Sequence, residues 1–273
     1  MTQISVELIS RGEPTTECVL NSIKKQTFTD YDITCINSSG NAEVSDLLRK
    51  FEVKEIIAIP ATKLLEARYL AHTNSSGRFR LLLDSTRPLE ENALEILISK
   101  YGNFSAVCVR EGPLGHGFWV KQADQLRSLS DNLFLDTAGE NVAYLLPRFY
   151  RAETLDKAFK FLKENIEDEL FKEISYGEHH LIYEAARLEK NEIAITDEIL
   201  LKHFEDTKAK VIFEKYRRYG KSQKTLNRLN IDSNAKRLKS HKRPYSKKRI
   251  FPMTITIPIR LLRVLAFLSG YIF

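Results

Sequence analysis

The stretch Arg78-Phe-Arg-Leu-Leu-Leu-Asp84-Ser-Thr86 decides the fold class of this chain. Its three leucines predict a buried strand, and Asp84 follows at the carboxyl end of that strand. In an open α/β sheet, ligands bind at this edge, where loop amides and helix N-termini gather. A carboxylate there repels a nucleotide diphosphate unless a divalent cation binds both groups. Asp84 is therefore a candidate metal ligand at a nucleotide site, and the alternative is a carboxylate that caps a turn or a helix.

Segments with strand composition alternate with amphipathic segments around this run. The expected strands are Ile4–Ile9, Tyr31–Ile36, Val53–Ile59 and Ser105–Val109, in addition to the leucine run. The expected helices are Pro14–Lys25, Ala42–Phe51, Thr62–Ala71 and Pro88–Tyr101. This alternation predicts βαβ units, and hence an α/β fold with a mostly parallel sheet flanked by helices.

The composition fits a globular protein that contains reduced thiols. At 273 residues and 43% hydrophobic, the chain can bury a full α/β core, in one large domain or two. Cys18, Cys35 and Cys108 lie within the helix and strand patterns, without the spacing of metal ligands. We expect reduced core residues in a protein facing the cytosol. Met1–Leu8 contains Glu7 and no basic segment before an apolar run, so no signal peptide is predicted.

Six segments, in the same order along the chain, resemble family-2 glycosyltransferases of the GT-A fold. They correspond to the opening of that family, the stretch leading to its Asp-x-Asp motif, the region before and at its Glu-Asp motif, and two later segments. In this chain they are Ile4–Ile33, Glu66–Leu89, Leu146–Arg151, Tyr176–Glu184, Ile195–Glu205 and Lys215–Ser222. The ordered set carries the resemblance, because no single motif is specific. It implies a Rossmann-like GT-A fold and an inverting transferase that uses a nucleotide-sugar donor.

The resemblance also implies roles on the donor side of the site. Asn37 would contact the nucleoside, and Arg68 would contact a phosphate or a sugar hydroxyl. Lys215–Lys221 interleaves tyrosine with arginine, which suits a diphosphate, so Arg217 or Arg218 would lie near the leaving group. The alternative for that segment is a solvated helix that ends at a glycine.

The expected metal site departs from the family pattern. The Asp-x-Asp motif is Asp84-Ser-Thr86 here, and Asn37 stands where the family usually has aspartate. Asp84, Thr86 and His203 are the candidate ligands for Mn²⁺ or Mg²⁺, together with the phosphates of the donor. Fewer carboxylates bind such cations more weakly. The alternatives are a site poor in metal or inactive, with His203 a residue at the end of a strand.

The candidate catalytic pair is Glu178-His179, where the family has Glu-Asp. In inverting transfer a base takes the proton of the acceptor hydroxyl as the oxygen attacks the anomeric carbon. A histidine with an ordinary pKa of about 6.5 can serve as that base at neutral pH. A lipid phosphate acceptor would need no base. The alternative is that His179 lies on the surface of a helix.

Positive charge is concentrated near the end of the sequence. Residues 208–249 contain 16 Lys and Arg against Glu214 and Asp232, a net charge of +14, so the rest of the chain carries −8. Ile250–Phe273 follows, with Arg260 and Arg263 on one face of an apolar helix. Its unbroken apolar part is shorter than the roughly 20 residues that a membrane span needs. A basic block beside an amphipathic helix predicts peripheral attachment to an anionic membrane.

Two alternatives exist for this C-terminal region. The terminal helix could pack on the catalytic domain or on a partner subunit. The basic block could bind nucleic acid, a reading disfavoured because the sequence has no module that reads bases.

These observations predict three parts. A GT-A-like domain covers residues 1–207, and a membrane-associating amphipathic helix covers residues 250–273. A basic segment over residues 208–249 closes the site and links the domain to that helix. The predicted function is transfer of a sugar from a nucleotide-sugar donor to a lipid-linked or other membrane-associated acceptor, a lipid or a glycan, at the cytoplasmic face of the membrane. The alternative is a catalytically weakened GT-A domain that acts as a scaffold for another transferase. The predicted protein partners are a second copy of the chain or that transferase.

Overall fold

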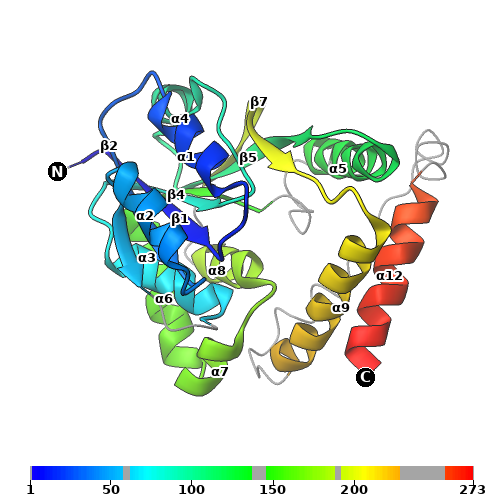
Figure 1. The fold of residues 1–273 in the computed structure, drawn as a ribbon. Helices are drawn as coiled ribbons and strands as arrows, with labels where there is room; N and C mark the ends of the chain where they lie inside the picture. Colours follow the sequence, from blue (N-terminus) through cyan, green and yellow to red (C-terminus); the bar gives the residue numbers. More distant parts are fainter. Residues whose placement is uncertain (1, 58–61, 137–145, 188–191, 228–255, 273) are drawn as a thin grey trace. The chain divides into compact units, whose positions relative to one another are not determined.

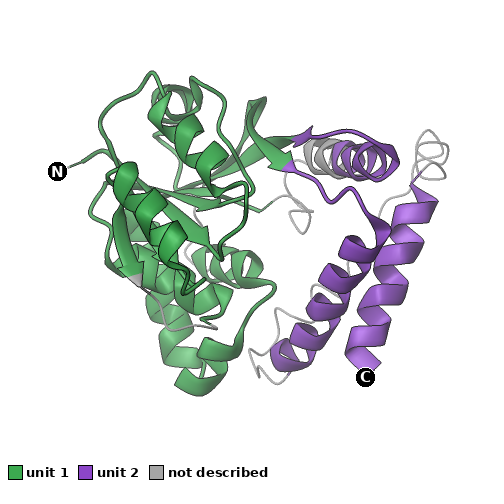
Figure 2. Cartoon of the chain, in the orientation of Figure 1, with its two compact units in different colours: residues 1–112, 146–203 green, residues 113–145, 204–273 purple. Residues whose placement is uncertain are grey.

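A computed structural model describes residues 2–57, 62–136, 146–187, 192–227 and 256–272. The chain divides into two compact units, shown in different colours in Figure 2. The first unit comprises residues 1–112 and 146–203, and the second comprises residues 113–145 and 204–273. The second unit therefore includes residues 113–145 besides the C-terminal region. The division of the sequence into three parts stays a prediction.

A seven-stranded sheet has the order β3-β2-β1-β4-β6-β5-β7 (Figure 1). Its strands are β1 (Ile4–Ser10), β2 (Tyr31–Asn37), β3 (Lys54–Ile57), β4 (Phe79–Asp84), β5 (Ala106–Leu114), β6 (Phe149–Arg151) and β7 (Ile193–Phe204). β1 pairs in parallel with β2 and β4, and β2 pairs in parallel with β3. β6 runs antiparallel to both β4 and β5. The predicted α/β fold with a mostly parallel sheet is confirmed.

The helices of the first unit are α1 (Thr16–Lys24), α2 (Ala42–Lys50), α3 (Leu64–Thr73), α4 (Ala93–Tyr101), α6 (Ala152–Asn165), α7 (Asp168–Glu173) and α8 (Glu178–Arg187). The predicted helix at Pro88–Tyr101 begins five residues late. The reason is that Leu89 forms an antiparallel bridge with Leu201, and the Glu90 amide donates to the Leu200 carbonyl. Residues used in sheet pairing cannot also begin the helix.

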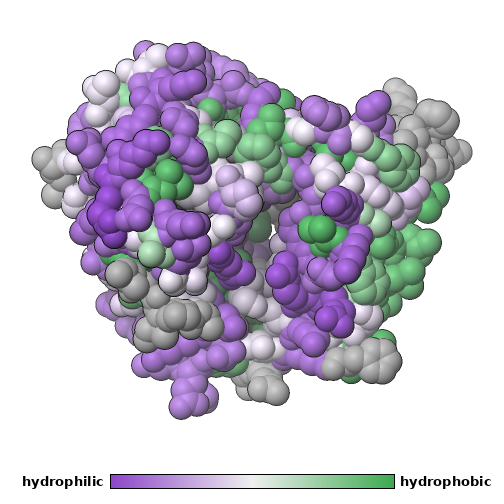
Figure 3. Space-filling view, viewed as in Figure 1, coloured by the Kyte–Doolittle hydropathy of each residue, from purple (hydrophilic) through white to green (hydrophobic). Residues whose placement is uncertain are grey.

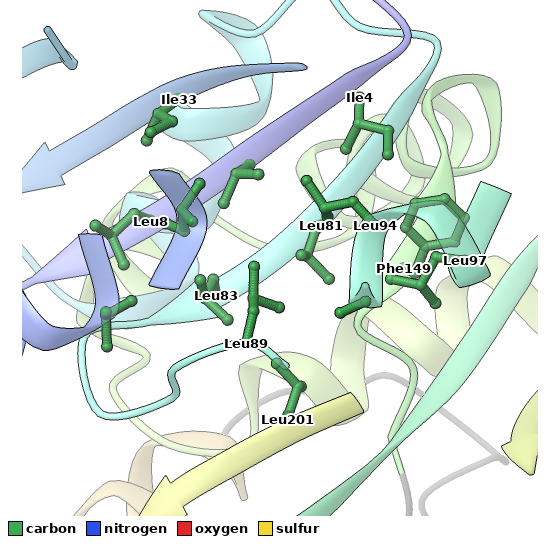
Figure 4. Packing of buried hydrophobic residues seen from close by; sticks show 14 of the residues in the cluster. Ile4, Leu8, Ile33, Leu81, Leu83, Leu89, Leu94, Leu97, Phe149 and Leu201 are labelled. Carbon is green, nitrogen blue, oxygen red and sulfur yellow. The ribbon is translucent and has the colours of Figure 1, made fainter. Parts of the chain in front are cut away.

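The core of the first unit lies on both faces of the parallel strands. Leu8, Leu81 and Leu83 are fully buried and pack with Leu94 and Leu97 of α4 (Figure 4). A second cluster packs Ile9 and Ile36 against Ala67 and Ala71 of α3. Strands buried on both faces read as continuous apolar runs, which is why the sequence predicts them well. Cys35 and Cys108 are buried as expected, whereas Cys18 is exposed, so the core assignment of Cys18 is wrong.

The strand register gathers polar residues at one edge of the sheet. Ser10 is aligned with Asn37 across β1 and β2, and Ile9 is aligned with Asp84 across β1 and β4. Asn37 and Asp84 therefore end the strands on either side of β1. This edge is where the sequence placed the site.

The second unit contains α5 (Phe118–Asp136), α9 (Ala209–Leu226) and α12 (Ile257–Ile272). α9 takes up the first half of the predicted basic segment, and residues 228–249 lie outside the described residues. α12 is the expected terminal helix and packs along α9 (Figure 1). None of the helices in the described part of the chain is long and apolar enough to cross a membrane.

α9 and α12 meet through two glycines. A methyl group on Gly220 would overlap the carbonyl oxygen of Phe267, and a methyl group on Gly270 would overlap the carbonyl oxygen of Arg217. Both obstacles are backbone atoms, which cannot rotate away as a side chain can. The two helices are therefore packed backbone to backbone at this crossing.

Replacing either glycine with alanine should destabilise this helix pair. In an exposed helix, Gly→Ala is stabilising by about 1 kcal/mol. Here the steric overlap should reverse the sign, and overpacking of this kind costs about 1–3 kcal/mol. Urea unfolding and the rate of tryptic cleavage within α9 would measure the effect. Lys221→Ala, at an exposed position of the same helix, should stay within about 0.5 kcal/mol of the parent. Glycine variants as stable as the parent would contradict the packing.

Candidate functional site

Asp84, the last residue of β4, is bound by three arginines. Its Oδ1 accepts from Nη2 of Arg68, and its Oδ2 accepts from Nη1 of Arg87. Nη1 of Arg148 lies 3.3 Å from the same Oδ2. Both carboxylate oxygens thus contact guanidinium groups. Burial acts to raise the pKa of Asp84, but attraction from Arg68, Arg87 and Arg148 outweighs it and holds that pKa well below its usual value.

Three different elements bring these arginines to the end of β4. Arg68 projects from α3, is fully buried, and donates to the Leu83 carbonyl at 3.0 Å. Arg87 lies in the turn after β4, where its amide donates to the Asp84 carbonyl at 3.0 Å. Arg148 directly precedes β6, and its Nη1 lies 3.3 Å from the carbonyl oxygen of Leu82. The three are called the arginine cluster below.

Glu111 of β5 is the second carboxylate of this network. Its Oε1 accepts from Nε of Arg87 at 2.9 Å and from Nε of Arg148 at 2.6 Å. Asp84 and Glu111 together hold Arg87 and Arg148 from two sides. Burial, followed by repulsion from Arg87, lowers the pKa of Arg148 below its usual value. The cations of the cluster therefore repel one another despite the two carboxylates.

His179 of α8 lies against the arginine cluster. Its Nε2 is 3.1 Å from Nη2 of Arg68 and 3.3 Å from Nη1 of Arg148. Guanidinium groups only donate, so we assign Nε2 as the acceptor and place the proton on Nδ1. Burial, with repulsion from the two arginines, holds the pKa of His179 well below its usual value. His179 is therefore buried and neutral rather than exposed on the helix surface, and its basic nitrogen is engaged.

Glu178 begins α8 and follows Gly177, whose φ of 80° lies in the left-handed region that glycine favours. Its side chain is buried, with Oε1 3.8 Å from Nε2 of His179. Burial raises the pKa of Glu178 above its usual value, and attraction from Arg68 opposes only part of that shift. A buried carboxylate with a raised pKa is suited to accept a proton near neutral pH.

Asn37 is held by its neighbours at the end of β2. Its side-chain nitrogen donates to Oε1 of Glu55 at 2.9 Å, and its Oδ1 accepts from the Ser39 amide at 3.1 Å. Glu55 lies on the adjacent strand β3. The amide at position 37 thus contacts a carboxylate one strand away.

The residues expected to hold a metal do not form a set that fits a divalent cation. Both oxygens of Asp84 are engaged by arginines, and Oγ1 of Thr86 lies 3.4 Å from Nη1 of Arg87. His203 is buried near the end of β7. Within the described ranges, no group of three or more His, Cys, Asp or Glu side chains is arranged to hold a metal ion.

The structure brings four of the sequence-predicted site residues together: Asp84, Arg68, Glu178 and His179. No role was predicted from the sequence for Arg87, Arg148 or Glu111, which complete this network. Arg87 follows the motif aspartate by three residues, and Arg148 lies within Leu146–Arg151, one of the segments that resemble the family. A basic residue close to the motif aspartate and another within a resembling segment were the sequence signals that could have indicated these two arginines. Arg217 and Arg218 lie on α9 in the second unit, and their role in donor binding stays a prediction.

Comparison with known proteins bears on the fold. No protein-family model matches the sequence, and no curated protein matches it. Among solved structures, S. aureus TarS 1–349 matches with a TM-score of 0.55 at 15% identity, over 98% of this chain and 81% of that chain. A structure of the same protein with UDP-GlcNAc matches with a TM-score of 0.53 at 13% identity, over 98% and 81% of the two chains.

A mannosyltransferase from Pyrobaculum calidifontis, solved with GDP-Man and Mn²⁺, matches with a TM-score of 0.52 at 12% identity, over 98% of this chain and 73% of that one. The chain has a GT-A-like glycosyltransferase fold. At these identities the comparison establishes the fold, and the activity has to be argued from the site.

His179 should make folding sensitive to pH below about 6.5. Its pKa is lowered in the folded state, so the unfolded chain takes up a proton first as the pH falls. Stability is therefore full above the unfolded pKa and decreases as the pH falls toward the folded pKa. Urea unfolding between pH 8 and pH 5 should show a smaller decrease for His179→Gln than for the parent. His116→Gln, at an exposed position, should follow the parent, and parallel curves for all three proteins would refute the assignment.

Proposed function

We propose that this protein is an inverting glycosyltransferase that uses a nucleotide-sugar donor. One observation carries the proposal: a buried carboxylate with a raised pKa, Glu178, borders an arginine cluster at the carboxyl edge of a GT-A-like sheet. Structures similar to this chain were solved with UDP-GlcNAc, UDP or GDP-Man. A nucleoside diphosphate leaving group develops negative charge, which nearby cations stabilise.

The proposed chemistry is a single displacement. The oxygen of the acceptor hydroxyl attacks the anomeric carbon and forms the new glycosidic bond. The bond between that carbon and the diphosphate oxygen breaks, and the electron pair leaves with the nucleoside diphosphate. Glu178 takes the hydroxyl proton, while His179 keeps its Nε2 engaged with Arg68 and Arg148.

Replacing Glu178 with glutamine should separate chemistry from binding. Glutamine keeps the shape of the side chain but cannot take a proton, and a general base contributes about 10²–10⁴-fold to rate. Transfer of radiolabelled sugar from UDP-, GDP- and CMP-sugars to membrane extracts should fall by at least about 100-fold. Donor affinity, measured by calorimetry, should change little. Glu178 must be ionised to act as a base, and its pKa is raised. As the pH is lowered, the activity of the parent should therefore begin to decrease at a higher pH than an ordinary carboxyl group would give.

Glu184→Gln on the same helix is the matched control, because Glu184 contacts Arg187 rather than the cluster. It should transfer sugar at the parental rate. Parental activity in Glu178→Gln would exclude Glu178 as the base. Absence of binding to every nucleotide and nucleotide sugar would contradict the proposed function.

A scaffold function is the second candidate. The engaged Nε2 of His179 and the amide of Asn37 stand where the family pattern has carboxylates, which favours weakened catalysis. Under this alternative, the parent binds a partner transferase and transfers no sugar itself. The assay above distinguishes the two candidates directly.

We also propose that the acceptor is membrane-associated and that α12 lies in the surface of an anionic membrane. One side of α12 is apolar and exposed, formed by Ile257, Leu261, Val264, Leu265, Leu268 and Ile272. The opposite side, which includes Ala266 and Gly270, is buried, and Gly270 meets α9. Figure 3 shows apolar residues gathered along the side of α12 that faces away from α9. The sequence before α12 carries the dense positive charge of residues 208–249, which complements anionic lipid.

Acidic substitutions on this side of α12 should remove membrane binding. Leu261→Asp with Leu265→Asp should abolish sedimentation of the full chain with vesicles that contain phosphatidylserine, because charge is costly in the acyl region. Val211→Asp, at an exposed apolar position near the start of α9, should bind as the parent does. High salt should release only part of the parent, since apolar burial does not depend on salt. Unchanged binding by the double variant, or no binding by the parent, would refute this role.

A further inference from the structure

We infer that the arginine cluster binds the diphosphate of the donor without a divalent metal, and that Asp84 positions the arginines instead of binding a cation. The inference rests on the proposed function, because it names how the same site recognises its donor. It concerns Arg68, Arg87 and Arg148, together with the carboxylates of Asp84 and Glu111.

The first step is the state of Asp84. A metal ligand must offer at least one oxygen to the cation, and both oxygens of Asp84 contact guanidinium groups. A divalent cation at this carboxylate would have to displace Arg68 or Arg87 and then lie beside the remaining guanidinium groups. Like charges a few ångströms apart inside a protein repel more strongly than they do in water. The donor set of this chain therefore opposes a divalent cation.

The second step is the charge of the cluster. Three guanidinium groups face two carboxylates, and the third carboxylate nearby, Glu178, has a pKa raised by burial. Nη1 of Arg148 and Nη1 of Arg87 contact the same Asp84 oxygen, so the two guanidinium groups lie close enough to repel each other. A bound anion would relieve this repulsion, so the charge balance favours an anionic ligand.

The third step is access and geometry. Arg68 is fully buried, whereas the side chains of Arg87 and Asp84 are 17% and 24% exposed, so Arg87 is the arginine that a ligand reaches most easily. A guanidinium group presents a planar set of donors that matches two phosphate oxygens, which an ammonium group cannot do. These donors suit the oxygens of a diphosphate.

The metal and arginine hypotheses predict opposite effects for Asp84→Asn. If Asp84 binds a metal, losing its charge should abolish nucleotide binding. If Asp84 holds the arginines, losing its charge makes the cluster more positive, and affinity for a diphosphate should stay the same or rise. The direction in which nucleotide affinity changes in Asp84→Asn therefore distinguishes the two hypotheses.

Calorimetry of UDP, GDP and inorganic pyrophosphate with the full chain tests the inference. We expect the Kd of the preferred nucleotide in EDTA to lie within threefold of its Kd in Mn²⁺, and Asp84→Asn to bind at least as tightly as the parent. Arg87→Gln should weaken binding at least tenfold, and Arg87→Lys should bind with intermediate affinity because it keeps the charge and loses the planar fork. Arg49→Gln removes an arginine from an exposed ion pair on α2 and should bind as the parent does.

The possible failures are distinct. Nucleotide binding that requires Mn²⁺, and that is lost in EDTA and in Asp84→Asn, would overturn the inference and leave the proposed function intact. Parental affinity in Arg87→Gln would also overturn it. No binding of UDP or GDP with or without Mn²⁺ would overturn the proposed function and the inference together. If Asp84→Asn fails to fold, the comparison of EDTA with Mn²⁺ on the parent chain still decides the question.

Discussion

The ionic network around Asp84 is the interaction on which the rest of the first unit depends. It joins the end of β4 to α3 through Arg68, to the turn after β4 through Arg87, and to the residue before β6 through Arg148. Glu111 extends it to β5. Buried charges are tolerated only when they are paired, and removing one partner leaves the others uncompensated. The network therefore fixes the relative positions of four elements at the edge where the chemistry is proposed to occur.

The same network determines what the neighbouring groups can do. Burial, with repulsion from Arg148 and Arg68, lowers the pKa of His179, so this histidine is neutral. The same two arginines donate to its Nε2, so the lone pair of that nitrogen is engaged. Glu178 is the adjacent titratable group, and burial shifts its pKa toward neutrality. The placement of the arginines is therefore the reason why the proposed mechanism assigns the base to Glu178 and not to His179.

Much of the architecture was predictable from the sequence, because β1, β2 and β4 are buried on both faces and their apolar runs are continuous. The position of Asp84 at the ligand-binding edge followed from the same pattern. The partners of Asp84 were not predictable, because Arg148 is 64 residues away in sequence and local periodicity says nothing of such a contact. The start of α4 was missed for a similar reason, since the pairing of Leu89 with Leu201 is a tertiary contact.

The crossing of α9 and α12 has a directional consequence. Successive residues of a helix are rotated by about 100°, so turning α12 by one position would drive a side chain into the carbonyl group of Arg217, where only the hydrogen of Gly270 fits. The rotation of α12 about its own axis, and with it the direction in which its apolar side points relative to α9, is therefore fixed. Neither Gly220 nor Gly270 belongs to the exposed apolar side of α12. A substitution at either position would change the direction of that side without changing its apolar residues, so the orientation of the helix and its hydrophobicity can be varied separately.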